Sequence, residues 1–226
     1  MEFKFSVGDK IKEAWPLYKE NFGMFILMVI ISFVTQSLGN EKHLFLAFVS
    51  FIVSILVSYV WIRSIINLVD KKEFKPFEKE SFPSISQYWN FLKTVFLSTL
   101  VIIVGVIFLI IPGLYLSGRL MFASYISVEK NQGARKSIRE SWDMTKDFGW
   151  KIFGKGLLVG LFILAGLIAL FFGVFITYPI GVIVLVMLYR EFSKFKNGTN
   201  SIPELTAVPE MPKPEVKEEV ITGEVK

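Results

Sequence analysis

Six apolar blocks, separated by polar segments, dominate the hydrophobic pattern of this chain. They cover residues 22–38, 44–66, 92–111, 114–128, 150–172 and 177–194. Roughly 20 apolar residues suffice to span a bilayer core about 30 Å thick. The pattern therefore predicts an all-α polytopic membrane protein with about six transmembrane helices. The first and fourth blocks are the shortest, and residues 94–118 are alternatively one long, kinked helix.

The turns between the blocks predict three helical hairpins. From Gly156 to Tyr189 the chain runs 34 residues without a charge. At 1.5 Å rise per residue this is about 50 Å of helix, too long for one crossing, so it folds back near Gly173 or at Tyr178-Pro179. Between the third and fourth blocks, Pro112 interrupts helical hydrogen bonding and Gly113 permits a tight reversal.

Lysine and arginine gather on alternate connections. Residues 70–93 carry five of them and residues 129–155 carry seven, whereas the connections 39–43, 112–113 and 173–179 offer only Lys42. Cytoplasmic loops near helix ends collect positive charge. Six spans place every basic segment on one face, so we expect both termini in the cytoplasm. Five spans would separate the basic 129–155 segment from the basic 190–196 segment.

A short internal repeat precedes two of the hairpins. Residues 11–15 (Ile-Lys-Glu-Ala-Trp) resemble residues 138–142 (Ile-Arg-Glu-Ser-Trp), and a fainter echo lies at 86–89. We therefore expect an amphipathic cytoplasmic helix before each hairpin. In the second copy one face is formed by Ala134, Ile138, Trp142 and Thr145. Trp15 and Trp142 would then lie in the headgroup region; alternatively, these helices only dock against the bundle.

Charge suggests which partner the surface binds. The formal net charge is +5, and residues 197–226, with six glutamates and three lysines, contribute −3, which leaves +8 for residues 1–196. In a membrane protein such a basic surface favours anionic lipid headgroups over nucleic acid, and Lys136, Arg139 and Lys146 are the candidate contacts. The Pro- and Glu-rich residues 197–226 cannot bury an apolar core, so we expect a disordered cytoplasmic tail after a membrane domain of residues 1–196.

Two arginines lie near the apolar blocks. Arg63 ends the second span and is expected to extend its guanidinium to the headgroups. Arg119 lies inside the fourth span, where an unpaired charge is costly, so it must reach water, a lipid phosphate or a helix-end carbonyl. It is either a binding residue or a hydrogen-bond hub that locks helices together. Its candidate polar neighbours are Gln36, Asn67, Tyr115 and Tyr178.

Few residues are suited to catalysis. The chain has no cysteine and one histidine, His43 in a short outer turn. Nucleophilic catalysis needs a nucleophile beside a base, and a metal site needs clustered His, Cys or carboxylate side chains. We expect no catalytic residue, no cofactor and no metal. Buried acids, which are typical of proton-coupled transporters, are not found within the spans, and the glycines of residues 154–173 favour close helix packing.

Residues 94–153 resemble a known prokaryotic family. They contain Ile111-Pro112-Gly113, Arg119-Leu120, Phe122-Ala123, Ser141-Trp142 and Thr145-Lys146. This pattern resembles the membrane domain of glycerophosphoryl diester phosphodiesterases and the related YciC-type inner-membrane proteins. The resemblance implies a six-span helical domain in a prokaryotic inner membrane. In fused members, catalysis belongs to a separate soluble barrel, so the resemblance does not imply phosphodiesterase activity for these residues.

Taken together, these patterns predict a non-enzymatic integral membrane protein that engages lipid headgroups or acts as a partner-binding scaffold. The expected partners are anionic lipids, another membrane protein or a second copy of the chain, and not nucleic acid. The alternative is a small-solute or lipid transporter or channel, with a polar path near Arg119. An enzyme acting on lipids is the least favoured possibility, because no nucleophile–base pair is evident.

Overall fold

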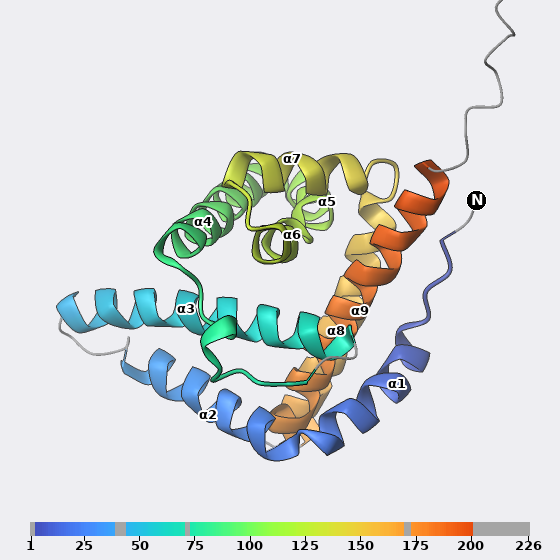
Figure 1. Ribbon diagram of the computed structural model, residues 1–226. Helices are drawn as coiled ribbons and strands as arrows, with labels where there is room; N and C mark the ends of the chain where they lie inside the picture. Colours follow the sequence, from blue (N-terminus) through green and yellow to red (C-terminus); the bar gives the residue numbers. More distant parts are fainter. Residues whose placement is uncertain (1–2, 39–43, 71–72, 170–172, 201–226) are drawn as a thin grey trace, which may run out of the picture.

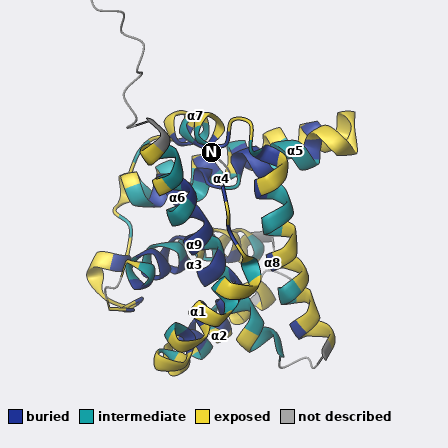
Figure 2. Ribbon diagram, turned by 90° about the vertical axis from the view of Figure 1, so that its right-hand side faces the viewer, coloured by how far each residue is buried: buried dark blue, intermediate teal, exposed yellow. Residues whose placement is uncertain are grey.

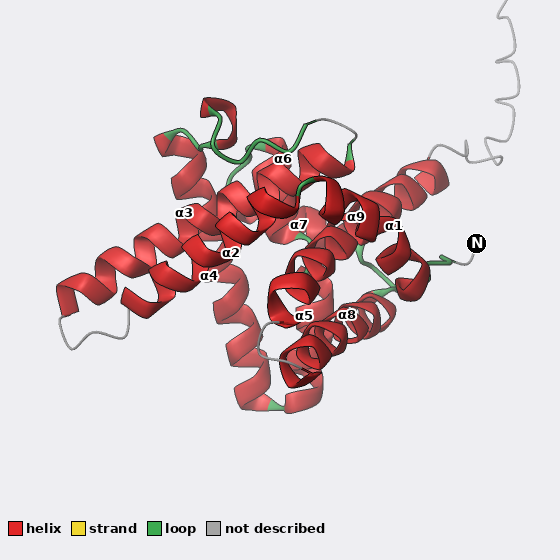
Figure 3. Cartoon of the chain, turned by 90° about the horizontal axis from the view of Figure 1, so that it is seen from below, coloured by secondary structure: helices red, strands yellow, loops and turns green. Residues whose placement is uncertain are grey.

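The structure is a computed structural model that describes residues 3–38, 44–70, 73–169 and 173–200. Every regular element in these ranges is a helix, which confirms the predicted all-α fold (Figure 3). The elements are α1 (Val7–Glu20), α2 (Phe22–Leu38), α3 (Leu44–Val69), the short 3₁₀ helix η1 (Lys79–Ser81), α4 (Ile85–Phe108), α5 (Ile110–Leu120), α6 (Ala123–Lys130), α7 (Ala134–Met144), α8 (Gly149–Ala169) and α9 (Val174–Asn200).

Several helices are long and apolar enough to cross a membrane. Among the described residues four meet this test alone, namely α3, α4, α8 and α9. A fifth is obtained if α1 and α2, which meet at a bend of 94°, are counted as one broken span. The chain is therefore a polytopic helical membrane protein, as predicted. The first predicted block, 22–38, has the bounds of α2.

The α4–α5 reversal differs from the prediction. The fourth predicted span, 114–128, is divided between α5 and α6, and the chain reverses at Leu109, whose φ of −162° and ψ of 134° are extended. Pro112 and Gly113 therefore lie in the first turn of α5 and not in the turn itself. Proline is tolerated there because the first helical N–H groups have no intrahelical acceptor. A Cβ on Gly113 would lie 2.7 Å from the backbone nitrogen of Val106, so this glycine permits close contact between α4 and α5.

Other helices also begin or end at residues that differ from the prediction. Helix α3 continues to Val69, so Arg63 lies within this helix and not at its end. Helix α4 begins at Ile85 after a capping box formed by Ser84 and Gln87. The α4–α5 hairpin consequently has no separate surface helix before it, because its polar start and its apolar span are one helix. Helix α9 runs from Val174 to Asn200 and so extends beyond the predicted span 177–194 at both ends. The remaining tail, and His43, lie outside the described residues.

Three hairpins, α2–α3, α4–α5 and α8–α9, extend in different directions from a common centre (Figures 1 and 3). Helix α6 and the middle of α9 form much of that centre. Half of the apolar window of α9 is buried, compared with 17% for α8 (Figure 2). Apolar side chains left exposed on α8 suit contact with lipid. The charged helices α1 and α7 pack beside this frame and form the two grooves described next.

Candidate functional site

Three of the cations singled out in the sequence, Lys136, Arg139 and Lys146, line one groove between α7 and the last turns of α9. We call this cavity of about 570 Å³ the α7 groove. Figure 1 shows α7 and the end of α9 at the same end of the molecule. The lining residues are Lys130, Lys136, Arg139, Glu140, Asp143, Met144, Lys146, Ser193, Lys196 and Asn197.

The α7 groove has an excess of positive charge. Five of its lining residues are lysine or arginine and two are acidic, which leaves a formal charge of +3. Its cations come from α6, from α7 and the turn after it, and from α9. A surface of this kind attracts anions, because each cation adds to the same local potential.

Only part of this charge is neutralised within the groove. Lys130 forms an ion pair with Glu140, whose second carboxylate oxygen accepts a hydrogen bond of 2.7 Å from Gln132. Burial raises the pKa of the Glu140 carboxyl, but the hydrogen bonds from Lys130 and Gln132 outweigh it and hold the pKa below its usual value. Arg139 and Asp143 are 3.9 Å apart and both exposed, so their pair is weak.

The other cations of the α7 groove are available to a ligand. Within the described ranges no carboxylate lies in ion-pair distance of Lys136 or Lys146. The Nζ of Lys196 lies 5.2 Å from the ring centroid of Phe148, a cation–π contact that leaves its positive charge in place. These three lysines, with the weakly paired Arg139, can therefore contact the oxygens of a phosphate group.

Small hydroxyl side chains dock α7 on the bundle. Ser137 and Ser141 are fully buried on α7, together with Thr145 just after it. The hydroxyls of Ser141 and Thr145 donate to the carbonyl oxygen of Arg119, at 2.9 and 3.0 Å. The buried face thus differs from the one predicted from the apolar residues, because Trp142 remains 39% exposed.

Arg119 is the centre of this docking contact. It is 3% exposed, and its Nη1 donates to the carbonyl oxygen of Thr145 at 3.1 Å. Its guanidinium carbon lies 4.2 Å from the ring centroid of Trp142 and 5.8 Å from that of Tyr115. Of the neighbours expected from the sequence, Tyr115 is present, whereas Gln36 bonds within α2. These hydrogen bonds join α7 to the end of α5, whereas the Nε of Arg119 is buried without a hydrogen-bond partner among the described residues.

Two glycines allow α5 and α8 to pack closely against each other beside α7. A Cβ on Gly118 would lie 2.3 Å from the carbonyl oxygen of Gly149, and a Cβ on Gly149 would meet the side chains of Tyr115 and Arg119 at 2.6 and 2.9 Å. The C-terminal end of α5 can therefore approach the start of α8 only because both positions lack side chains. The rings of Tyr115 and Trp150 lie 5.8 Å apart at the same place.

Two predicted candidates lie elsewhere. Arg63 is half-buried within α3, and Trp15, 45% exposed, lies on α1 with its ring 5.9 Å from that of Tyr18. Neither residue lines the α7 groove. The structure therefore brings Lys136, Arg139 and Lys146 together, places Arg119 of α5 against Trp142 of α7, and leaves Arg63 and Trp15 apart.

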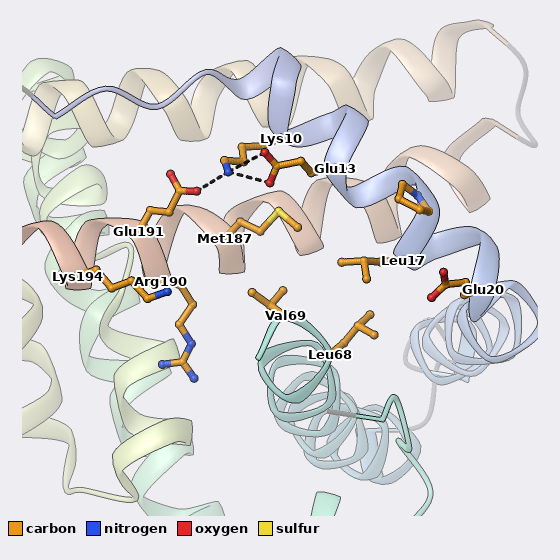
Figure 4. A pocket seen from close by; sticks show the side chains of 11 residues that line it. Lys10, Glu13, Leu17, Glu20, Leu68, Val69, Met187, Arg190, Glu191 and Lys194 are labelled. Carbon is orange, nitrogen blue, oxygen red and sulfur yellow. Dashed lines mark hydrogen bonds and ion pairs between the residues drawn. The ribbon is translucent and has the colours of Figure 1, made fainter. Parts of the chain in front are cut away.

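A second charged groove, the α1 groove, lies between α1, the end of α3 and α9 (Figure 4). Its volume is about 590 Å³. Its lining residues are Lys10, Glu13, Pro16, Leu17, Glu20, Leu68, Val69, Met187, Arg190, Glu191 and Lys194. Three of these are cationic and three are acidic, and apolar side chains lie between them (Figure 4).

Internal ion pairs occupy most cations of the α1 groove. Lys10 pairs with Glu13 at 2.8 Å and also with Glu191. Arg190 contacts Asp70 at 2.6 Å and also Glu129. This last network could not be predicted from the sequence, since its members belong to separate elements: Asp70 directly follows α3, Glu129 lies near the end of α6 and Arg190 lies within α9. The only indication of this network in the sequence is a charged residue next to each apolar block. Such a residue does not show which charges form ion pairs in the fold.

The described part of the chain contains no group of three or more His, Cys, Asp or Glu side chains placed to hold a metal ion. Glu129, Glu140 and Glu191 are instead engaged with lysines, arginines or Tyr189.

Comparison with known proteins identifies one family. Residues 89–199 match the family model for the membrane domain of glycerophosphoryl diester phosphodiesterase, which confirms the resemblance seen in the sequence. No curated protein and no solved structure matches the chain. The matched segment contains Arg119 and the whole α7 groove, whereas α1, which forms one wall of the α1 groove, lies outside it.

Proposed function

We propose that this integral membrane protein, with its membrane domain of the glycerophosphoryl diester phosphodiesterase type, binds anionic lipid headgroups through the α7 groove. We further propose a non-enzymatic role, as a membrane domain that holds lipid or presents it to a partner. One observation carries the proposal: Lys136, Lys146 and Lys196 face the same groove without a carboxylate partner in the described residues.

The position of the groove supports a headgroup ligand. It lies next to the start of α8, where Trp150 is half-exposed and Lys151 follows, and next to the end of α9. Tryptophan rings and basic side chains are enriched where a membrane helix leaves the hydrocarbon core. A lipid in the adjacent leaflet could therefore place its phosphate in the groove while its acyl chains remain beside the apolar helices. The charge pattern of the connections favours the cytoplasmic leaflet.

The expected preference is moderate and depends on salt. A basic residue near an anionic membrane surface contributes about 1 kcal/mol, so three free lysines give roughly 3 kcal/mol, or on the order of 100-fold in affinity. Screening by salt lowers this figure, because the groove is open to solvent.

The test compares two variants of equal charge. In the first, Lys136→Gln, Arg139→Gln and Lys146→Gln remove three cations from the α7 groove. In the matched control, Lys4→Gln, Lys12→Gln and Lys19→Gln remove three exposed cations elsewhere. Purified proteins in detergent are titrated with short-chain phosphatidylglycerol and with short-chain phosphatidylcholine.

We expect the groove variant to lose at least tenfold in affinity for phosphatidylglycerol and to keep its affinity for phosphatidylcholine. The control should bind both lipids like the wild type. Equal losses in the two variants would show that net charge alone, and not the α7 groove, attracts the lipid, and the proposal would then fail.

A further inference from the structure

The C-terminal segment of the chain starts beside the α7 groove. Ser193, Lys196 and Asn197 of α9 line the groove, and α9 ends at Asn200. Three residues separate Asn197 from that end, which is about 5 Å along the helix axis. Residues 201–226 therefore leave the helix within one turn of the wall of the groove.

The charge of this segment is complementary to the groove. Residues 201–226 contain six glutamates and three lysines, a formal charge of −3. The α7 groove has a formal charge of +3. Two of the glutamates, Glu218 and Glu219, are adjacent, and Glu215 precedes them closely, so several carboxylates could face the free lysines together.

The acidic residues are also within reach. Glu215 to Glu219 lie 15 to 19 residues beyond Asn200. A Pro-rich chain of this length can span at most about 3.1 Å per residue, or roughly 45–60 Å. An intramolecular ligand on such a tether has an effective concentration in the millimolar range, so a weak electrostatic contact suffices for occupancy.

We infer that residues 201–226 occupy the α7 groove and compete there with anionic lipid headgroups. This inference rests on the proposed function, because it assigns a regulator to the same site. The carboxylates of the tail replace the lipid phosphate as partners of Lys136, Lys146 and Lys196, so an anionic lipid must displace the tail to bind. The α1 groove offers the tail less free charge, because Lys10 and Arg190 are already paired with acidic residues, which leaves Lys194 as its one lining cation without an ion pair among the described residues.

The experiment uses the full-length chain with all six tail glutamates changed to glutamine, which removes the charge and keeps the length. This tail variant is made in the wild type and in the Lys136→Gln, Arg139→Gln, Lys146→Gln background.

Each protein is titrated with short-chain phosphatidylglycerol at low and at high salt. We expect the tail variant to bind phosphatidylglycerol three- to tenfold more tightly than the wild type at low salt, with little difference at high salt. In the groove background the same tail change should have no effect.

Each other outcome identifies what has failed. An unchanged affinity in the tail variant, with the groove variant still weakened, overturns the inference and leaves the proposed function in place. An equal gain in both backgrounds also overturns it, since the tail would then act through bulk charge. An affinity that does not depend on the groove lysines overturns the proposed function itself.

Cross-linking gives a second, direct test. The natural chain has no cysteine, so Asn197→Cys and Glu218→Cys can be introduced as a single pair. We expect oxidation to form the intramolecular disulfide, and added phosphatidylglycerol to slow it. The control pair, Trp15→Cys with Glu218→Cys, places the first cysteine on exposed α1. Equal disulfide formation in the two pairs would contradict docking of the tail in the α7 groove.

Discussion

The α1 groove and the α7 groove are similar in volume and have different free charge. The α1 groove, of about 590 Å³, has three cations and three acidic residues. The α7 groove, of about 570 Å³, has five cations and two acidic residues. In the first, carboxylates of neighbouring helices hold Lys10 and Arg190. In the second, most of the lysines have no such partner among the residues that the structure describes.

From this difference we expect that pairing, together with the number of basic residues, decides which groove can bind an anion. A lysine held by two carboxylates must lose those contacts before it can bind a phosphate. The ion pairs of the α1 groove instead connect α1, α3, α6 and α9, so this groove serves to hold helices together. The comparison also agrees with the family match, which contains the whole α7 groove.

The largest effect on stability and lipid binding is expected when the close packing of α5 on α8, next to the α7 groove, is disrupted. In Gly118→Val the new side chain would collide with the backbone of Gly149, since even a Cβ would lie 2.3 Å from its carbonyl oxygen. Such overpacking costs about 1–3 kcal/mol and should displace the start of α8, and with it the preceding α7 segment, from α5. We expect a lower thermal unfolding midpoint and loss of the preference for phosphatidylglycerol.

The control for this change is Gly160→Val in α8, where a Cβ would meet no atom within 4 Å. It tests the cost of valine in a helix without a collision. If Gly118→Val unfolds at the same temperature as this control and binds phosphatidylglycerol normally, the packing of α5 on α8 does not position the groove.

A second change should convert the α1 groove into an anion site. Glu13→Gln together with Glu191→Gln releases Lys10 from both of its partners. In the background that lacks Lys136, Arg139 and Lys146, we expect this pair to restore about fivefold in affinity for phosphatidylglycerol, since one free cation contributes about 1 kcal/mol. Titration with the short-chain lipid measures the gain.

The matched control, Asp9→Asn with Glu20→Gln, removes the same charge from α1 without releasing Lys10. A similar gain in this control would mean that net charge, and not the released lysine, restores binding. The distinction between paired and free cations would then fail.

A smaller effect is expected within the α7 groove. Glu140→Gln removes the partner of Lys130 and makes that lysine available. An ion pair of this exposure contributes about 0.2–1 kcal/mol, so we expect roughly a twofold gain in affinity for phosphatidylglycerol. Asp143→Asn should gain less, because Asp143 lies 3.9 Å from Arg139 in a weak pair. A loss of affinity in Glu140→Gln would show that Glu140 is needed to position Lys130.

The smallest effect concerns pH. The pKa of Glu140 lies below its usual value of 4.5, so this carboxyl stays charged at any pH above that value and its pair with Lys130 is lost only as pH falls through the lower, folded pKa. Affinity for phosphatidylglycerol should therefore change less than about twofold between pH 8 and pH 5. A marked rise in affinity over this range would indicate that Glu140 is protonated earlier than its contacts imply.

Much of the helical architecture could be predicted from local composition. The block 22–38 corresponds to α2, and the uncharged run from Gly156 divides into α8 and α9 within a few residues of the expected turn. The errors occur where tertiary contacts decide. Pro112 and Gly113 predicted a turn, but the chain reverses at Leu109 because Gly113 is used for contact with α4.

The candidate site was predicted only in part. Charge composition identified Lys136, Arg139 and Lys146, because they lie in one basic segment next to a span. Lys196 was not singled out, since it lies 50 residues beyond Lys146 and joins the groove only through the packing of α9 beside α7. Arg119 was recognised as unusual, but its two possible roles could not be separated without its partners.

The sequence by itself determined the membrane class, the helical fold and the segments that carry excess charge, because hydropathy and charge are properties of short stretches of chain. Only the tertiary structure decided which charges remain free. Whether a lysine is neutralised depends on the distance to carboxylates far away in sequence, as with Arg190 and its partners Asp70 and Glu129. Coulomb interactions fall with distance and are screened within about 10 Å, so the folded positions of these residues, and not their order in the chain, distinguish the α7 groove from the α1 groove.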